Sequence, residues 1–236
     1  MKIGVFAYNF KHWKTQAGIQ NLILNGNKPC VVFAANPVEL KFYRSKIRTT
    51  PKDLFLSHPR KIAEQNNIDY YVVKHNSNQT SELVEKYDLD LGIILGARIL
   101  KPLAFSNFKK GVLNMHPGIL PENRGLDTTK WAIEKDMPQG VTAHIIDKNI
   151  DRGLLVSMEK IKIYEDDTLL DLQIRIQNLE QKLMIDSIKL IQERDPKMFE
   201  KVEKGNYHKS MPSNIENNLL KKFIEYRNAR SSKKHI

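Results

Sequence analysis

Asn114 and His116 are the residues whose types and spacing best suit acyl chemistry. They lie in the stretch GVLNMHPGILPENRG, residues 111–125, which begins as a short apolar strand that Pro117 and Gly118 end. Side chains two apart on a strand point to the same side, so Asn114 and His116 can face one cavity. An amide donor beside a base that titrates near neutrality suits acyl transfer. The alternative, for so short a motif, is a capping Asn and a partly buried His at a strand end.

A second polar segment, HIIDKNIDRG at residues 144–153, offers a partner for that histidine. A carboxylate that orients and charges a histidine is the usual third member of such a site, and Asp147 and Asp151 supply candidates. Alone, Asp151 would be a turn or helix-cap residue. Together with the amide and the histidine it is assigned a catalytic role, whereas His144, on an apolar strand, is assigned a structural one.

The elements that must position these residues alternate between strand and helix, which predicts an α/β fold with a mostly parallel sheet flanked by helices. Ligands in such sheets bind beyond the carboxyl ends of the strands. Buried strands are expected at 2–8, 30–35, 70–73, 91–95, 111–115 and 141–146, with an antiparallel addition at 154–164. Helices are expected at 14–24, 60–66, 80–87, 129–135, 167–191 and 214–226.

The strongest helical pattern is an apolar stripe at three-and-four spacing between Leu169 and Ile191. Asp167 is the expected N-cap of this helix. The stripe predicts a core face or the surface of a homodimer. A catalytic α/β domain is expected over residues 1–195, followed by a short C-terminal extension over 196–236.

Composition and cysteine usage bound the class of protein. The chain has 236 residues, of which 41% are hydrophobic, enough for one domain with a sizeable core. The single cysteine, Cys30, lies in an apolar run and is expected to be a core residue of a protein from a reducing compartment, here the cytoplasm. No apolar run approaches membrane-spanning length and the N-terminus is too short and polar for a signal peptide, so no membrane partner is expected.

The formal net charge of +11 invites a nucleic-acid interpretation, but the charge is spread along the chain. Zinc-finger spacing, an RRM-type aromatic pattern and a P-loop are all missing from the sequence, and no nucleic-acid partner is expected. A milder interpretation of the positive charge is that the protein acts on a polyanionic small molecule. The basic loop from Lys41 to Lys52 is either an ordinary exposed loop or one that meets a charged substrate.

LNMHPGILPENRG followed by GVTAHIIDKNIDRG resembles the formyltransferases that use N10-formyltetrahydrofolate. That family includes glycinamide ribonucleotide, methionyl-tRNA and nucleotide-sugar N-formyltransferases. The resemblance covers about residues 91–153, and the strand–helix–strand start agrees in pattern only. The signature N-x-H-P-x-x-L-P, a following R-G and a loop ending D-x-G correspond here to Asn114, His116, Pro117, Leu120, Pro121, Arg124, Gly125, Asp151 and Gly153.

The resemblance implies a Rossmann-like formyltransferase fold and transfer of a formyl group to an amine. Asn114 and protonated His116 would stabilise the charge on the formyl oxygen, His116 would also carry protons, and Asp151 would hold His116. Folate carries the activated group, so no metal is required. LGIILGARILKP resembles the folate-contacting loop of the family, which implies cosubstrate contacts by Arg98, Ile99, Leu100, Asp147 and Ile150.

The acceptor is inferred from departures from the family pattern. AYNFKHWKTQAG replaces the Gly-Ser-rich phosphate loop of the ribonucleotide enzymes, and the segment after Pro196 is too short for the nucleic-acid-binding domain of the methionyl-tRNA enzymes. YHK at 207–209 resembles an element seen late in several nucleotide-sugar enzymes. The favoured acceptor is therefore a nucleotide-linked amino-deoxy sugar, dTDP-4-amino-4,6-dideoxyglucose above others, for O-antigen or other surface-glycan synthesis. Substrate contacts are expected from Lys11, Trp13, Arg44, Lys46 and Arg124.

Three other functions stay open. One is phosphoribosylglycinamide formyltransferase of purine synthesis. Another is a basic RNA-binding module on a formyltransferase shell, against which the intact catalytic residues argue. The third is a hydrolase that releases formate from the folate.

Overall fold

The computed structural model describes residues 1–39, 45–52 and 54–231. Within them one seven-stranded sheet has the strand order β3-β2-β1-β4-β5-β7-β8. Pairing is parallel from β3 to β5 and antiparallel between β5 and β7 and between β7 and β8. The predicted mostly parallel sheet is confirmed. The strands are β1 (Ile3–Tyr8), β2 (Val31–Ala35), β3 (Asp69–Val72), β4 (Leu91–Ile94), β5 (Val112–His116), β7 (Gly140–Ile145) and β8 (Leu154–Lys160).

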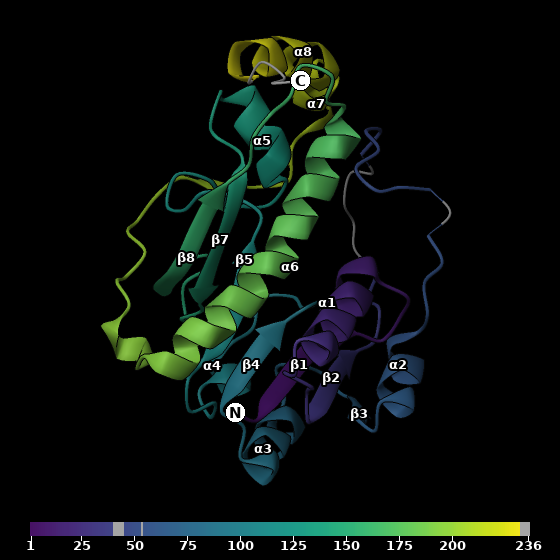
Figure 1. Cartoon of the computed structure of the whole chain (residues 1–236), viewed down its shortest axis with the longest axis vertical. Coiled ribbons are helices and arrows are strands. Elements are labelled where there is room, and N and C mark those ends of the chain that lie inside the picture. Colours follow the sequence, from purple (N-terminus) through teal and green to yellow (C-terminus); the bar gives the residue numbers. More distant parts are fainter. Residues whose placement is uncertain (40–44, 53, 232–236) are drawn as a thin grey trace.

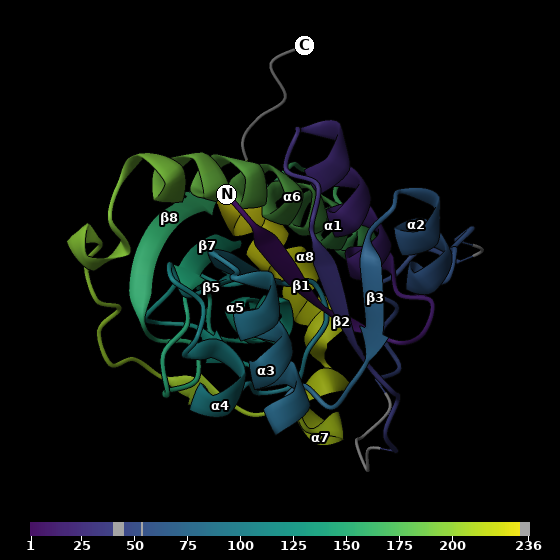
Figure 2. The same ribbon diagram turned by 90° about the horizontal axis from the view of Figure 1, so that it is seen from below.

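Helices cover both faces of this sheet (Figure 1). Figure 2 shows α1 and α6 on one face and α3 and α4 on the other. Helices α5, α7 and α8 gather at the end of the sheet toward which β5 runs (Figure 1). The helices are α1 (Trp13–Leu24), α2 (Pro59–Gln65), α3 (Asn78–Tyr87), α4 (Pro102–Phe105), α5 (Thr128–Glu134), α6 (Leu169–Glu193), α7 (Ser213–Glu216) and α8 (Leu219–Arg230), with a 3₁₀ turn at Pro196–Met198.

Alternation along the strands sorts the core into two layers. In β1, Val5 points into the larger cluster beneath α1 and α6, and Phe6 points into the smaller one beneath α3 and α4. Gly4 and Gly92 face the smaller layer, where an added Cβ would lie 2.6 Å from Leu89 and 2.7 Å from Val112, respectively. Both glycines therefore make room for the side chains that pack α3 and α4 against the sheet.

Short elements are where the sequence-based prediction fell short. It missed α4 and β6 (Arg124–Gly125), which pairs in parallel with β9 (Tyr207–His208) in a small two-stranded sheet. The single helix expected at 214–226 is wrong, because the chain forms α7 and α8 there. Leu219, Phe223 and Tyr226 of α8 join the larger core cluster, so this helix packs on the α/β body.

Helix α6 begins one residue later than the sequence indicated. Its N-cap is Thr168, whose hydroxyl accepts from the amide of Asp171 at 3.2 Å while the Asp171 carboxylate accepts from the Thr168 amide at 2.8 Å. Asp167 is not the cap because its carboxylate is bound by both terminal nitrogens of Arg175 at 2.8 Å.

The apolar stripe of α6 lies in the core, so it is not a free surface for a dimer partner. Among the helices of the described ranges, none is both long enough and apolar enough to cross a membrane.

The cap predicts a simple stability difference. Thr168→Ala removes the acceptor for the Asp171 amide and is expected to lower the free energy of unfolding by about 1 kcal/mol, measured by urea denaturation. Thr168→Ser keeps the hydroxyl and serves as the matched control. Equal stability of all three proteins would show that Thr168 does not cap α6.

Candidate active site

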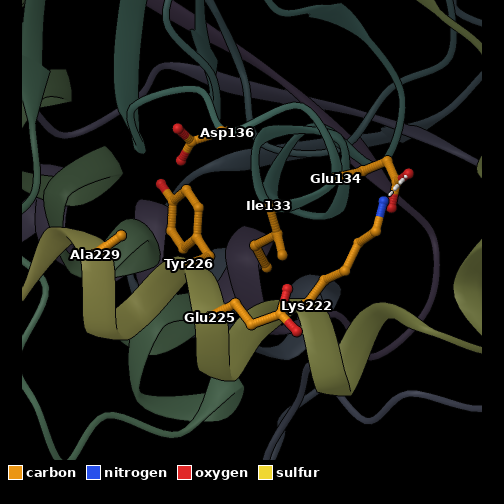
Figure 3. A pocket seen from close by; sticks show the side chains of 7 residues that line it. All are labelled: Ile133, Glu134, Asp136, Lys222, Glu225, Tyr226 and Ala229. Carbon is orange, nitrogen blue, oxygen red and sulfur yellow. Dashed lines mark hydrogen bonds and ion pairs between the residues drawn. The ribbon is translucent and has the colours of Figure 1, made fainter.

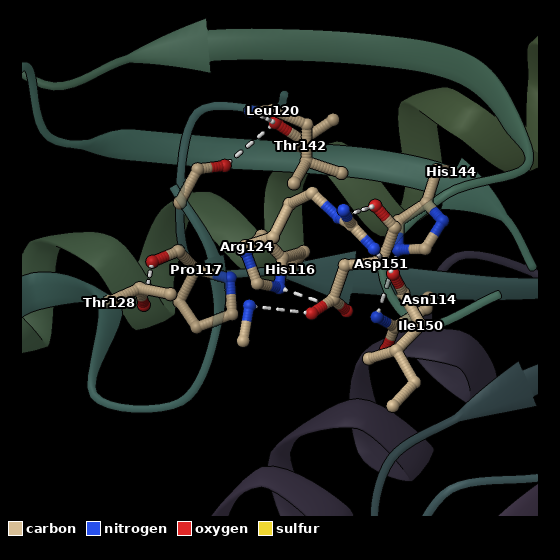
Figure 4. A network of polar contacts seen from close by, with 12 residues as sticks. Asn114, His116, Pro117, Leu120, Arg124, Thr128, Thr142, His144, Ile150 and Asp151 are labelled. Atoms are coloured by element: carbon tan, nitrogen blue, oxygen red, sulfur yellow. Dashed lines mark hydrogen bonds and ion pairs between the residues drawn. The ribbon is translucent and has the colours of Figure 1, made fainter. Parts of the chain in front are cut away.

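The pairing of β5 with β7 brings the candidate residues to one face of the sheet. Asn114 lies opposite His144, and His116 lies opposite Thr142. Because residues two apart on a strand share a face, all of these side chains point to the same side (Figure 4). Leu113 and Met115 alternate with them and point into the larger core cluster.

Asn114 is oriented by His144. The Asn114 amide nitrogen lies 3.1 Å from Nε2 of His144, whose Nδ1 lies 2.8 Å from the carbonyl oxygen of Arg152. A carbonyl only accepts, so Nδ1 carries the proton and Nε2 accepts from Asn114. Burial, with the nearby His116, lowers the pKa of His144 to about 4, so this ring stays neutral near pH 7. One amide hydrogen of half-buried Asn114 is thereby held, and the other remains for a ligand oxygen.

His116 stands between two acceptor oxygens. Its Nε2 lies 2.7 Å from the carbonyl oxygen of Asn123, and its Nδ1 lies 3.4 Å from a carboxylate oxygen of Asp151. A neutral imidazole has one N–H and can donate to only one of these, whereas the protonated ring donates to both. The ring is only 3% exposed. The geometry thus favours a buried imidazolium–carboxylate pair beside the Asn114 amide.

Asp151 reaches His116 from a tight turn after β7. Its φ of 48° is in the left-handed region, which Asp tolerates better than most residues, and Gly153 follows with a φ of 105°. Burial raises the pKa of Asp151, but the His116 bond and charge together with the Gly125 amide, 2.8 Å away, outweigh it, so this pKa lies below its usual value. Asp151 is therefore ionised near neutrality.

The loop over residues 117–128 follows β5 and is anchored by several hydrogen bonds. The Thr142 hydroxyl donates to the Gly118 carbonyl at 2.7 Å and accepts from the Leu120 amide at 3.1 Å. Thr128 donates to the carbonyl of Pro117 (Figure 4). The loop that carries the Asn123 carbonyl is thus fixed to the same strand pair that carries the catalytic candidates.

Arg124, a predicted substrate contact, is 9% exposed. Its guanidinium donates to the backbone carbonyls of Ile150 at 2.5 Å, Asp151 at 3.2 Å and Gly205 at 3.1 Å. These bonds join the loop to the Asp151 turn and to the C-terminal segment. They leave the guanidinium little freedom to bind a substrate, although a substrate contact stays a prediction.

The other predicted substrate residues are spread over two regions. Lys11 is exposed, and Trp13 begins α1 and lines a small cavity of about 30 Å³ between α1 and α6. Lys46 is exposed, and its amide donates to Glu216 of α7 at 3.1 Å. Arg44 lies outside the described residues.

The predicted folate contacts come from two loops. Ile99 and Ile150 expose 62% and 37% of their surface, whereas Leu100 is buried at 7%. Arg98 donates to the Val38 carbonyl at 3.4 Å, and the Asp147 carboxylate accepts from the Asn149 amide at 2.7 Å. Ile99 and Ile150 thus offer apolar surface for a flat ring, while Leu100 supports its loop from inside. The cosubstrate role of these residues remains a prediction.

Sequence reasoning missed a partly buried ion pair next to β5. Lys14 donates to Glu180 of α6 at 2.6 Å and to the carbonyl of Met115, between Asn114 and His116, at 3.1 Å. The Glu180 side chain is only 5% exposed. The sequence does hold one indication of this pair. Glu180 is a charged residue next to Leu179 on the apolar face of α6, where only a paired charge is expected.

A cavity of about 290 Å³ lies between α5 and α8, lined by groups that include Glu134, Lys222 and Tyr226 (Figure 3). No catalytic candidate lines it. In the part of the chain that the structure describes, no group of three or more His, Cys, Asp and Glu side chains could hold a metal ion.

The family of this protein is shown by a match to a family model. Residues 17–188 match the family model described as formyl transferase. The chain belongs to the formyl transferase family.

Two solved structures share the fold. Glycinamide ribonucleotide transformylase 1 from Symbiobacterium toebii superposes with a TM-score of 0.62 at 21% identity, over 82% of this chain and 88% of that one. The formyltransferase PseJ from Anoxybacillus kamchatkensis, in complex with UDP-4,6-dideoxy-4-formamido-L-AltNAc and tetrahydrofolate, superposes with a TM-score of 0.51 at 27% identity, over 64% of this chain and 79% of that one.

A curated relative is the GDP-perosamine N-formyltransferase of Brucella melitensis biotype 1, which is 33% identical over 108 residues. The matched stretch is 45% of this chain and 42% of the relative. The chain spans less than half the length of the curated relatives it matches.

Acid sensitivity follows from the low pKa of His144. Between the ordinary value of 6.5 and about 4, the unfolded chain binds a proton at this position that the folded chain does not. The free energy of unfolding should therefore fall as the pH drops through this window, by about 3 kcal/mol from this group.

Urea denaturation at pH 7.5 and pH 4.5 measures this loss. Because other groups titrate in both proteins, the test is the difference between wild type and His144→Asn, which should lose less stability on acidification. The same loss in both would contradict a neutral buried His144.

Proposed function

We propose that this protein transfers the formyl group of N10-formyltetrahydrofolate to the amino group of a nucleotide-linked amino-deoxy sugar. The observation that carries the proposal is the oriented Asn114 amide beside the His116–Asp151 pair. The tetrahydrofolate in the structure of the PseJ relative supports folate as the carrier.

The geometry suits the chemistry of such a transfer. When an amine attacks the formyl carbon, negative charge develops on the formyl oxygen. The free amide hydrogen of Asn114 and the positive charge of protonated His116 stabilise that oxygen. Asp151 keeps His116 oriented and charged, and it accepts protons from the attacking amine through water. The C–N bond to the folate nitrogen then breaks as His116 gives that nitrogen a proton, and the proton held by Asp151 passes back to His116.

The nature of the acceptor is inferred from the loop after β1. Tyr8 and Phe10 stack there with ring centroids 5.0 Å apart and an interplanar angle of 9°. His12 packs edge-on against Tyr8, and Lys11 is exposed beside them. This aromatic and basic surface suits a nucleotide better than a bare phosphate. The GDP-perosamine enzyme among the relatives and the UDP-sugar in the PseJ structure support the same class.

Within this class, dTDP-4-amino-4,6-dideoxyglucose is the proposed acceptor and surface-glycan synthesis the proposed setting. The protein would act in the cytoplasm as a homodimer. The second candidate is formylation of glycinamide ribonucleotide, which the superposition with the S. toebii transformylase favours.

Removing the amide donor is expected to damage chemistry rather than folding. Asn114→Ala should lower kcat by about 10²–10³-fold, the usual effect of losing one oxyanion donor. His116→Ala should lower kcat by about 10²–10⁴-fold through loss of the proton carrier. Asn107→Ala, an exposed amide on the surface, is the matched control. Wild-type kcat in both site variants would remove these residues from the mechanism.

The acceptor is tested by product mass. The protein is mixed with N10-formyltetrahydrofolate and, in parallel, with dTDP- and UDP-amino sugars, glycinamide ribonucleotide and charged initiator tRNA. A gain of one formyl group on a nucleotide sugar is expected. Formylation of the ribonucleotide alone would show that the proposed acceptor is wrong.

A further inference from the structure

The C-terminal segment 205–211 pairs with the loop over residues 117–128, which carries Asn123 and Arg124. Strands β6 and β9 pair Arg124 with Tyr207 and Gly125 with His208. The Arg124 amide donates to the Asn206 carbonyl at 3.1 Å, and the Leu126 amide donates to the His208 carbonyl at 2.9 Å. An added Cβ on Gly125 would lie 2.0 Å from that His208 oxygen, so the two backbones are as close as a glycine allows.

The His208 side chain contacts Asn123, Trp131 and Lys135. Its ring is 5% exposed and stacks on Trp131 with centroids 5.1 Å apart. Nε2 lies 2.9 Å from the ammonium of Lys135, and Nδ1 lies 3.1 Å from the side-chain oxygen of Asn123. An ammonium only donates, so Nε2 accepts and Nδ1 carries the proton. His208 therefore donates a hydrogen bond to Asn123.

Asn123 connects this bond to the catalytic histidine. It is 1% exposed, and its side-chain nitrogen donates to the Thr128 carbonyl at 2.8 Å. Its side-chain oxygen accepts from His208, and its backbone oxygen faces Nε2 of His116 at 2.7 Å. All polar atoms of the Asn123 side chain are thus engaged, and the carbonyl that holds His116 belongs to the same fixed residue.

We propose that His208 is a positioning residue for His116: by donating to Asn123 it fixes the carbonyl that binds Nε2 and so directs Nδ1 of His116 to Asp151. The kinetic part of this inference rests on the proposed function. The contacts on which it stands exist in the protein without substrate.

The physical reason is that His116 needs two acceptors in place to keep its charged form and its orientation. The Asp151 turn supplies one, and the loop over 117–128 supplies the other. Without the His208 bond, the buried oxygen of Asn123 loses its donor and the loop shifts to find another. A shift of about 1 Å in a catalytic group can lower the rate by about 10²-fold.

His208→Leu removes the donor while keeping an apolar side chain against Trp131. His208→Asn retains a donor near the position of Nδ1 and should rescue activity. Tyr207→Leu is the matched control. It also introduces leucine into β9, but at the neighbouring position, where the residue is 45% exposed. Thermal unfolding of each variant reports whether the fold is kept.

Steady-state kinetics should separate positioning from binding. His208→Leu is expected to lower kcat by about ten- to a hundred-fold with little change in KM, since the substrates bind other groups. His208→Asn should stay within about threefold of wild type, as should Tyr207→Leu. A kcat for His208→Leu within about twofold of wild type, or an equal loss in His208→Leu and His208→Asn, would overturn the proposal.

A spectroscopic measurement decides the question without any acceptor. In protein labelled with ¹⁵N-histidine, the ring nitrogen signals of His116 report which nitrogens are protonated. They should change in His208→Leu and stay near wild type in His208→Asn and Tyr207→Leu. Unchanged His116 signals in His208→Leu would overturn the proposal. If the signals change as expected while wild-type protein formylates no acceptor, the proposed function fails and the positioning role stands.

Discussion

The antiparallel register between β5 and β7 is the constraint on which the site depends. It sets Asn114 opposite His144 and His116 opposite Thr142. A slip of one residue would turn Asn114 and His116 into the core and bring Leu113 and Met115 to the site. The carboxylate of Asp151, in the turn between β7 and β8, then meets His116. One strand pair thus provides the amide, the histidine and the support for the carboxylate.

The C-terminal segment adds contacts to the loop that carries Asn123 and Arg124. Arg124 bonds the carbonyls of the Asp151 turn and of Gly205 together, and β6 pairs with β9. Through Asn123 the same segment reaches His116. Residues 196–236 were expected to form a short C-terminal extension, and that boundary stays a prediction. Contacts from residues 205–208 join this segment to the loop that carries Asn123 and Arg124.

Much of the fold could be predicted from the sequence because buried strands and amphipathic helices leave local patterns. The catalytic candidates were found because Asn114 and His116 sit two apart at a strand end. The remaining features depend on partners distant in sequence: His208 and Asn123 are 85 residues apart, and Lys14 and Glu180 are 166 apart. No local pattern encodes such pairs. The cap of α6 was misassigned because Asp167 and Thr168 both suit a cap, and only the Arg175 contact decides between them.

In the proposed reaction, the Asn114 amide and the His116–Asp151 pair surround a formyl group carried by folate. The most direct measurement is a crystal structure of the protein with an N10-formyl folate analogue that cannot transfer its formyl group. We expect the formyl oxygen at about 2.7–3.1 Å from the Asn114 side-chain nitrogen, with the pterin between the loops that carry Ile99 and Ile150. Folate bound elsewhere, for example between α5 and α8, or a formyl group that does not contact Asn114, would contradict it.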